Sequence, residues 1–191
     1  MCIRDRLDLM PQIGYGTWLS EAGEVYQGTK AALACGYRHI DEAWVYMNED
    51  EVGRAISEAL AVGVCTREEL WVTTKLWQCH HRPELVREGC VDSMTKLGVE
   101  QLDLFLMHFP VSFQPGVVEA TTQEMMDDVP IEDTWRAMEK LVDEGLVRNI
   151  GGKPRHSPAT SRRPARPRLS CLLYTSPSPR DATLSRMPSS A

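Results

Sequence analysis

Short apolar runs alternate with longer stretches of helical periodicity between residues 10 and 151. The runs lack polar alternation and are rich in Ile, Leu and Val, which is typical of strands buried on both faces of a parallel sheet. We predict five such strands, at residues 12–14, 37–40, 70–74, 102–107 and 147–150.

The segments between these runs repeat apolar residues at the spacing of one helical face. Asn48 with Glu51 resembles a capping pair, and Pro83 stands where a helix is expected to begin. Five strands and four helices in strict alternation predict an α/β fold with right-handed crossovers. The three clearest apolar stripes are Val52, Ala55, Ile56, Ala59 and Leu60; Val86, Cys90, Met94 and Leu97; and Ile131, Trp135, Met138 and Val142.

The composition changes abruptly after Gly151. Residues 1–151 contain thirteen Lys and Arg against twenty-six Asp and Glu, whereas residues 152–191 contain eight against one. The second part also has seven Pro, eight Ser and neither Phe nor Trp, so it lacks the side chains of a packed core. We predict a disordered basic tail there. A nucleic-acid-binding arm is a weaker alternative, since aromatic residues do not interleave with the basic ones.

The overall balance of residues narrows the partners and the compartment. A net charge of −6 implies no general affinity for nucleic acid or an anionic membrane. The six cysteines are scattered without a CxxC pair, which is typical of reduced thiols in a reducing compartment. Residues 1–6 lack the apolar stretch of a secretory signal, and no apolar run approaches the roughly 20 residues of a membrane helix. We expect a cytoplasmic protein.

Three polar residues stand at equivalent places after successive predicted strands: Asp41, Lys75 and His108. Because the carboxyl ends of parallel strands meet at one edge of a sheet, these side chains are expected to converge. Tyr46 lies five residues beyond Asp41, in the loop before the next helix, and can fold back over the same edge. A nearby ammonium lowers the pKa of a phenol, so the four residues predict a proton-handling site.

Each of these residues also has an ordinary structural interpretation. Asp41 alone could be a turn or capping residue, Lys75 a solvated strand end and His108 a core histidine. Three of them at matching strand ends, with Tyr46 in the loop after the first, are much less expected by chance than one alone. Residues 79–81, Cys-His-His, are too closely spaced for a tetrahedral metal site, so we predict a loop there and no metal.

Five stretches of the chain carry a more specific pattern: MPQIGYGTW (10–18), GYRHIDEAWVYMNE (36–49), TKLW (74–77), LMHFP (106–110) and WRAMEKLVDEGLVRNIG (135–151). In this order and spacing they resemble the aldo-keto reductase family, which includes aldose, xylose and aldehyde reductases. The resemblance covers residues 10–151 without a gap. It implies the N-terminal part of a (β/α)8 TIM barrel, about five βα strands, whose members reduce aldehydes and ketones with NADPH and sometimes NADH.

The resemblance also implies roles for individual residues. Tyr46 would protonate the carbonyl oxygen as hydride arrives, and His108 would orient the carbonyl. Lys75, paired with Asp41, would lower the pKa of Tyr46.

A cofactor site and a substrate pocket follow from the same resemblance. For Trp18 and Trp77, packing in the core is an equally good interpretation. The nicotinamide cofactor would contact Gly16, Thr17, Trp18 and Asp41. The wall of the substrate pocket would consist of Trp18, Val45, Trp77, His108 and Phe109.

Residues 152–191 depart from the family pattern, which continues through three more strands. A full barrel needs about 250 residues. We interpret residues 1–9 as a leader outside the family and residues 152–191 as a frame-shifted or chimeric continuation, since both ends resemble translated sequencing adapters. Open edges of an incomplete barrel then predict aggregation or dimerisation.

Three functions from different classes fit these observations. The first is NAD(P)H-dependent reduction of an aldehyde or ketone, such as an aldose, by the intact parent protein. The second is a non-catalytic barrel that binds a cofactor or a subunit, although such a role does not require all four polar residues. The third is an inert truncated fragment. The insertion at 111–130 is expected to border the mouth without revealing the substrate.

Overall fold

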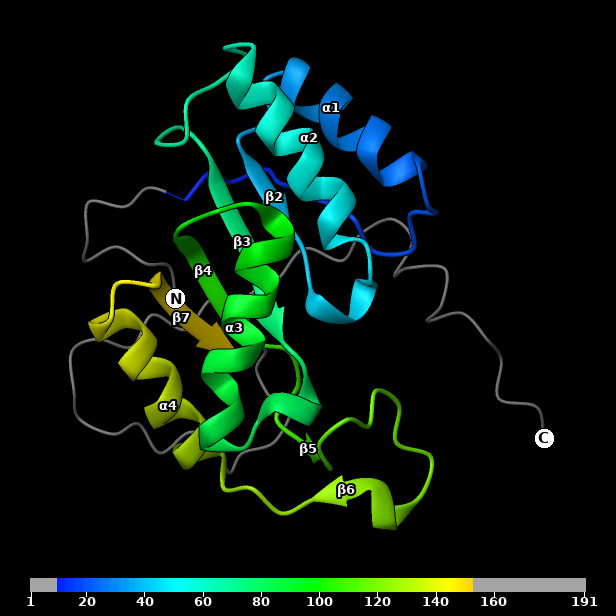
Figure 1. The fold of residues 1–191 in the computed structure, drawn as a ribbon, viewed down its shortest axis with the longest axis vertical. Helices are drawn as coiled ribbons and strands as arrows, with labels where there is room; N and C mark the ends of the chain where they lie inside the picture. The colour runs from blue at the N-terminus through cyan, green and yellow to red at the C-terminus, as the bar shows by residue number, and fades with distance from the viewer. Residues whose placement is uncertain (1–9, 153–191) are drawn as a thin grey trace.

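The computed structural model describes residues 10–152, which form a parallel β-sheet covered by helices (Figure 1). The sheet strands are β1 (Tyr15–Gly16), β2 (His39–Asp41), β3 (Trp71–Leu76), β4 (Leu102–Met107) and β7 (Val147–Gly152). They pair in the order β1-β2-β3-β4-β7, all parallel, so neighbours in the sheet follow one another along the chain. The predicted α/β fold is confirmed, and β1 and β7 form the two edges of this sheet within the described range.

Four of the five strands lie within two residues of their predicted limits, and β4 coincides with them. The prediction for the first strand, 12–14, is wrong. Gln12 and Ile13 are exposed, and pairing with β2 begins only where Tyr15 lies opposite Ile40. The apolar Ile13 suggested a buried strand, but its side chain faces solvent rather than a core.

The apolar stripes lie on helices that pack against the sheet. The helices are α1 (Glu24–Ala34), α2 (Glu49–Ala61), α3 (Pro83–Leu97) and α4 (Ile131–Asp143), and neighbours in this order contact one another. Pro83 begins α3 as predicted. The main core fills the space between helices and sheet, and among its stripe residues Val52, Ile56, Val86, Leu97 and Met138 are at most 1% exposed.

Successive side chains of β3 point to opposite faces of the sheet. One face packs in the core, and the other carries the polar residues. All six residues of β3 and of β4 are buried, as the continuous apolar runs predict. Val72 and Leu76 join the core beneath the helices. Trp71 joins Leu104 of β4 in a smaller cluster on the other face. Lys75 has the same parity as Trp71, so it belongs to the face away from the helices.

The start of α2 differs from its prediction. Asn48 occupies the N-cap position, but no side-chain capping bond forms there. The amide of Asn48 instead donates to the carbonyl oxygen of Thr17 at 3.2 Å, and the carboxylate of Glu51 accepts from the backbone of Gly23 at 2.8 Å. Both side chains are used to fix the segment after β1 against α2, which is why the capping pair is absent.

The insertion at 111–130 contains structure of its own. Strands β5 (Ser112–Phe113) and β6 (Met126–Asp127) form an antiparallel pair, with the 3₁₀-helix η3 (Gln123–Met125) directly before β6. Arg82 anchors this pair, because its guanidinium donates to Asp127 at 2.7 Å and to the side-chain oxygen of Gln114 at 2.9 Å. The insertion is thus fixed to the start of α3, below the sheet in Figure 1.

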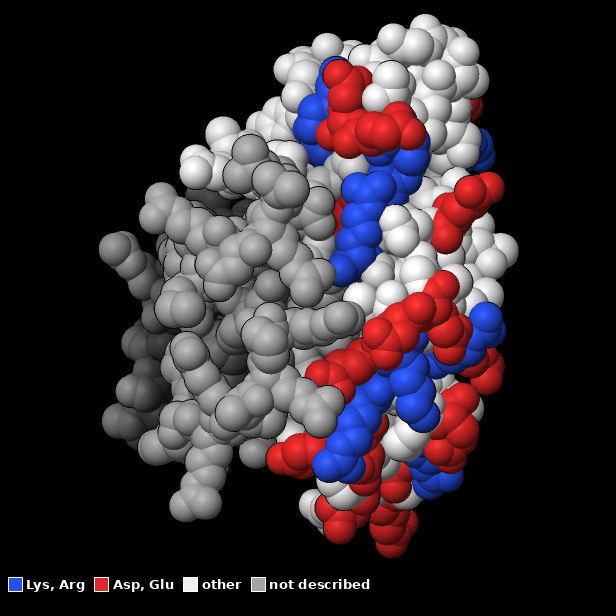
Figure 2. Space-filling view, turned by 90° about the vertical axis from the view of Figure 1, so that its left-hand side faces the viewer, with Lys and Arg blue, Asp and Glu red and all other residues white. Residues whose placement is uncertain are grey.

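Charged side chains of both signs are interleaved on the face shown in Figure 2, where Lys and Arg lie beside Asp and Glu. Exposed pairs such as Arg87 with Glu144, 2.9 Å apart, fit this pattern. Within residues 10–152, none of the helices has the length and apolar character needed to cross a membrane. The predictions for residues 1–9 and 153–191, including the basic tail, lie outside the described residues.

Candidate active site

The structure brings the predicted polar residues together at the carboxyl end of the sheet. Asp41 is the last residue of β2, Lys75 is the fifth of the six residues of β3, and His108 directly follows β4. The ammonium of Lys75 donates to Asp41 Oδ1 at 2.8 Å and to the hydroxyl of Tyr46 at 3.2 Å. It also donates to the carbonyl oxygen of Glu42 at 2.7 Å, so three acceptors surround one buried cation.

Tyr46 reaches this position from a short turn after β2. It is the last residue of the 3₁₀-helix η1 (Trp44–Tyr46). Its ring lies 6.0 Å from that of His108 between centroids, at an interplanar angle of 81°. The phenol therefore lies between the ammonium of Lys75 and the imidazole of His108, both of which are at least 95% buried in the chain.

The electrostatics of this group favour a charged lysine and a protonated tyrosine. Burial lowers the pKa of Lys75, but the carboxylate of Asp41 and the hydroxyl of Tyr46 outweigh it and hold that pKa above its usual value. Burial raises the pKa of Tyr46, and the ammonium of Lys75 offsets only part of the rise. Lys75 thus acts on the Tyr46 pKa in the predicted direction, although burial outweighs this effect and leaves the pKa above its usual value.

Sequence reasoning missed Glu42, a carboxyl buried beside this group. The residue is 0% exposed, its Oε2 accepts from the backbone N–H of Ala43 at 3.2 Å, and Oε1 has no hydrogen-bond partner among the described residues. Burial raises the pKa of Glu42 to about 8, and the neighbouring Glu49 adds to the rise, while Thr17 and Lys75 oppose it. No local pattern distinguishes Glu42 from an exposed acid, because its burial depends on the approach of Thr17 and α2.

We expect Glu42→Gln to remove a pH-dependent loss of stability. A carboxyl whose folded pKa lies above its unfolded value destabilises the fold as pH rises between the two values, here from 4.5 to about 8. The free energy of unfolding of the variant, relative to that of the parent, should therefore increase by an amount on the order of a few kcal/mol between about pH 5 and pH 8. Urea unfolding of both proteins across this range measures the difference; a constant difference would contradict it.

Aromatic side chains gather next to His108. The indole of Trp77 meets the imidazole edge to face at 5.1 Å between centroids, and Phe109 stacks on the imidazole at 4.8 Å. Phe113 of the insertion lies 6.3 Å from Trp77. The indole N–H of Trp77 donates to the carbonyl oxygen of Val118 at 2.8 Å. The insertion thus borders this cluster, as predicted, although Phe113 and Val118 were not singled out.

The remaining predicted pocket residue and the cofactor residues lie around the same edge. Val45 is in η1 beside Tyr46 and is partly exposed. Trp18 is 50% exposed, which argues against the core-packing interpretation for this tryptophan. Trp77 is partly buried in the ring cluster, so its position fits both packing and the predicted wall of a substrate pocket.

Gly16, Thr17 and Asp41 lie side by side at this edge of the sheet, where Gly16 is exposed and Asp41 partly exposed, whereas Thr17 is fully buried. Gly16 pairs with Asp41 in the sheet register, and the hydroxyl of Thr17 donates to the carbonyl oxygen of Asp41 at 3.3 Å. A Cβ built on Gly16 would meet nothing within 4 Å, so the main chain is open there. The open main chain at Gly16 thus lies beside a partly exposed carboxylate.

Residues 79–81 serve the packing of α3. Cys79 and His80 lie in the 3₁₀-helix η2 (Gln78–His80), so the prediction of a plain loop is wrong in detail. Ser112 of β5 lies 3.2 Å from Nδ1 of the buried His81.

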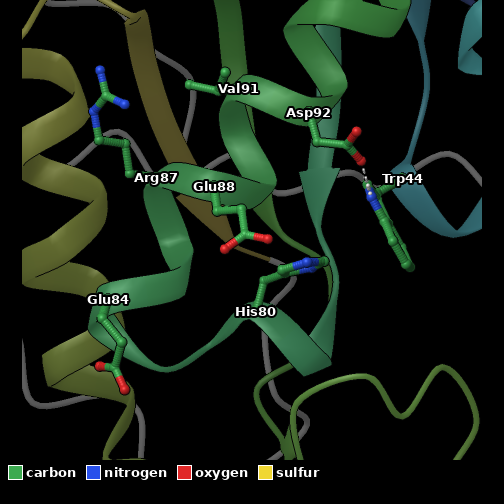
Figure 3. A pocket seen from close by; sticks show the side chains of 7 residues that line it. All are labelled: Trp44, His80, Glu84, Arg87, Glu88, Val91 and Asp92. Carbon is green, nitrogen blue, oxygen red and sulfur yellow. Dashed lines mark hydrogen bonds between the residues drawn. The ribbon is translucent and has the colours of Figure 1, made fainter.

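A groove of about 710 Å³ lies between Trp44, His80 and α3 (Figure 3), and its lining does not include Tyr46, Lys75 or His108. In residues 10–152, no group of three His, Cys, Asp or Glu could hold a metal ion.

Five parallel strands backed by helices, with a buried lysine, a carboxylate, a tyrosine and a histidine at their carboxyl ends, have the arrangement of the first part of an α/β barrel. Residues 12–152 match the Aldo/keto reductase family. The chain belongs to this family.

Individual relatives agree with this assignment. The chain is 47% identical over 149 residues to aldo-keto reductase family 1 member A1-A of Danio rerio, an alignment that covers 74% of this chain and 45% of the relative. It is 42% identical over 159 residues to aldose reductase B of Dictyostelium discoideum, covering 78% and 51%.

Solved structures give the same result for the fold. The aldose reductase of Schistosoma japonicum superposes with a TM-score of 0.72 at 47% sequence identity, covering 75% of this chain and 49% of that one. The chain therefore has the first strands of the (β/α)8 barrel. It spans about half the length of the relatives that it matches.

Proposed function

We propose that this chain supplies the proton-transfer half of a nicotinamide-dependent carbonyl reductase that converts small aldehydes or ketones to alcohols. The observation that supports the proposal most strongly is the hydrogen bond from Lys75 to the hydroxyl of Tyr46 at 3.2 Å, with Asp41 at 2.8 Å on the same ammonium. A buried ion pair that contacts a phenol, at the open end of a barrel sheet, is suited to proton donation.

Each of four residues has a separate role in the proposed proton transfer. Tyr46 is protonated at neutral pH, because burial keeps its pKa above the usual value. Its hydroxyl donates a proton to the carbonyl oxygen, and the ammonium of Lys75 stabilises the phenolate that remains. His108 lies beside the phenol and orients the carbonyl oxygen toward it. Asp41 holds Lys75 in place through their 2.8 Å ion pair.

NADPH is the proposed cofactor, with NADH as the alternative. Gly16, Trp18 and Asp41 would hold its nicotinamide end, with the buried Thr17 behind them, because the main chain at Gly16 is open and adjoins a carboxylate. The chemistry that such a cofactor supplies is hydride donation to the carbonyl carbon. The rings of Trp77 and Phe109 and the exposed indole of Trp18 offer apolar surface to the carbon skeleton of the substrate.

The proposal is tested with two proteins. One is the 191-residue chain itself. The other is a chimera that joins residues 10–152 to the part of the Schistosoma japonicum aldose reductase that lies beyond the matched region. NADPH binding is measured by fluorescence quenching, and glyceraldehyde or 4-nitrobenzaldehyde is then added while NADPH oxidation is followed.

Aldehyde-dependent oxidation by either protein supports the proposal. If the chimera oxidises NADPH and the chain does not, the second half of the barrel is needed for cofactor binding, and the 191-residue chain is inert by itself. Saturable binding without turnover in both proteins favours a cofactor-binding barrel instead. If neither binding nor turnover occurs in the chimera, the proposal is wrong.

A further inference from the structure

The proposed proton donor lies on a segment with few restraints of its own. Helix η1 is a single turn, closed by the N–H of Tyr46 donating to Ala43 at 2.9 Å and the N–H of Met47 donating to Trp44 at 3.3 Å. Met47 then takes a left-handed conformation, with φ of 57°, and its side chain is 69% exposed. A non-glycine residue in this conformation is held there by contacts elsewhere.

One side chain of this turn is held from outside. The indole N–H of Trp44 donates to Oδ2 of Asp92 on α3 at 2.6 Å, which is the dashed line in Figure 3. The same carboxylate pairs with Lys96 at 2.7 Å, and the Lys96 ammonium lies 5.4 Å from the centroid of the Trp44 ring. Trp44 therefore has a charged acceptor at its N–H and a cation over its face.

A second contact fixes the other side of the indole. His80 of η2 meets Trp44 edge to face at 4.9 Å between centroids. Behind His80, a Cβ built on Gly89 of α3 would lie 3.0 Å from the imidazole, so α3 approaches η2 as closely as a glycine allows. The imidazole thus contacts α3 on one side and the indole on the other, beside the groove that they line.

We propose that Trp44 is a positioning residue, which with Asp92 and His80 clamps the η1 turn to α3 and so holds the hydroxyl of Tyr46 at Lys75. The inference rests on the proposed function only as far as Tyr46 is the proton donor. A single residue, Val45, separates Trp44 from Tyr46 within one turn, so a shift of the indole moves the phenol. A small displacement of a proton donor is enough to reduce turnover.

Four variants separate this role from general packing. Trp44→Phe keeps an aromatic ring against His80 but removes the N–H, and Asp92→Leu removes the acceptor. Asp92→Asn keeps an acceptor oxygen while it weakens the pair with Lys96. Trp135→Phe is the matched control, because it also removes an indole N–H bonded to a carboxylate, that of Glu139 at 3.2 Å, but on α4.

The first readout is independent of catalysis. Hydrogen exchange at the amides of Tyr46 and Met47 should be about tenfold faster in Trp44→Phe and Asp92→Leu than in the 191-residue parent chain. Asp92→Asn and Trp135→Phe should exchange at parental rates there. Equal exchange at these amides in Trp44→Phe and the parent overturns the proposal, whether or not the chain turns over an aldehyde.

The second readout uses whichever protein, chain or chimera, oxidises NADPH with aldehyde. Trp44→Phe and Asp92→Leu should lower kcat by about tenfold with the KM for NADPH unchanged, since cofactor binding does not involve the clamp. Recovery of kcat in Asp92→Asn supports the hydrogen bond as the cause. A loss of kcat in Trp135→Phe as large as in Trp44→Phe overturns a role specific to Trp44. Absence of turnover in the parent proteins counts against the proposed function and leaves the exchange result to decide the clamp.

Discussion

Tyr46→Phe should lower aldehyde-dependent NADPH oxidation by about 10²–10⁴-fold, the range expected for loss of a general acid. The substitution removes the hydroxyl that accepts the 3.2 Å bond from Lys75 and keeps the ring that faces His108. Cofactor affinity should be unchanged, because the proposed cofactor contacts lie at the end of β1 and at Asp41. Parallel measurements of kcat and of NADPH fluorescence quenching separate the two effects.

Lys75→Met serves as the partner variant for this prediction. It leaves the phenol in place but removes the cation that holds down the tyrosine pKa and stabilises the phenolate. Turnover should fall, and the pKa of Tyr46 should rise further, which a tyrosinate titration at alkaline pH would show. If Tyr46→Phe keeps the full turnover of the parent, another group delivers the proton and the assignment of Tyr46 is wrong.

The placement of Asp41, Lys75 and His108 could be predicted because it depends only on topology. Parallel strands joined by helices must bring their carboxyl ends to one edge, and each of these residues stands at such an end. The same reasoning located the buried strands β3 and β4, since continuous apolar runs are typical of strands covered on both faces. Nothing about distant contacts was required for either result.

The features that the sequence did not predict depend on distant side chains. The Trp44–Asp92 bond joins residues 48 positions apart, and nothing near either residue in the chain indicates the other. The Glu51 side chain fits a capping box by spacing, yet its carboxylate accepts from Gly23, 28 residues away. The sequence indicated the effect of Lys75 on the Tyr46 pKa but not the larger effect of burial, which the charge of a neighbour alone does not show.

Gly53→Ala should destabilise the fold severely, although alanine is the better helix former. A Cβ at position 53 of α2 would overlap the carbonyl oxygen of Lys96 and lie 2.7 Å from the carbonyl carbon of Leu97, both in the backbone of α3. Backbone atoms in a packed helix cannot turn away as a side chain can, so the two helices must separate. We expect a loss of about 3 kcal/mol or more, well beyond the roughly 1 kcal/mol of helix propensity gained.

The control for this prediction is Ser57→Ala, an exposed substitution on the same helix that changes propensity without a clash. Urea midpoints followed by helical circular dichroism compare the two variants, and equal midpoints would show that α2 and α3 can part at little cost. Because Asp92 and Lys96 lie on α3, a displaced α3 also releases Trp44. Folded Gly53→Ala protein should therefore show faster hydrogen exchange at the amides of Tyr46 and Met47. This result would show that the packing of α2 against α3 controls the position of the Tyr46 hydroxyl.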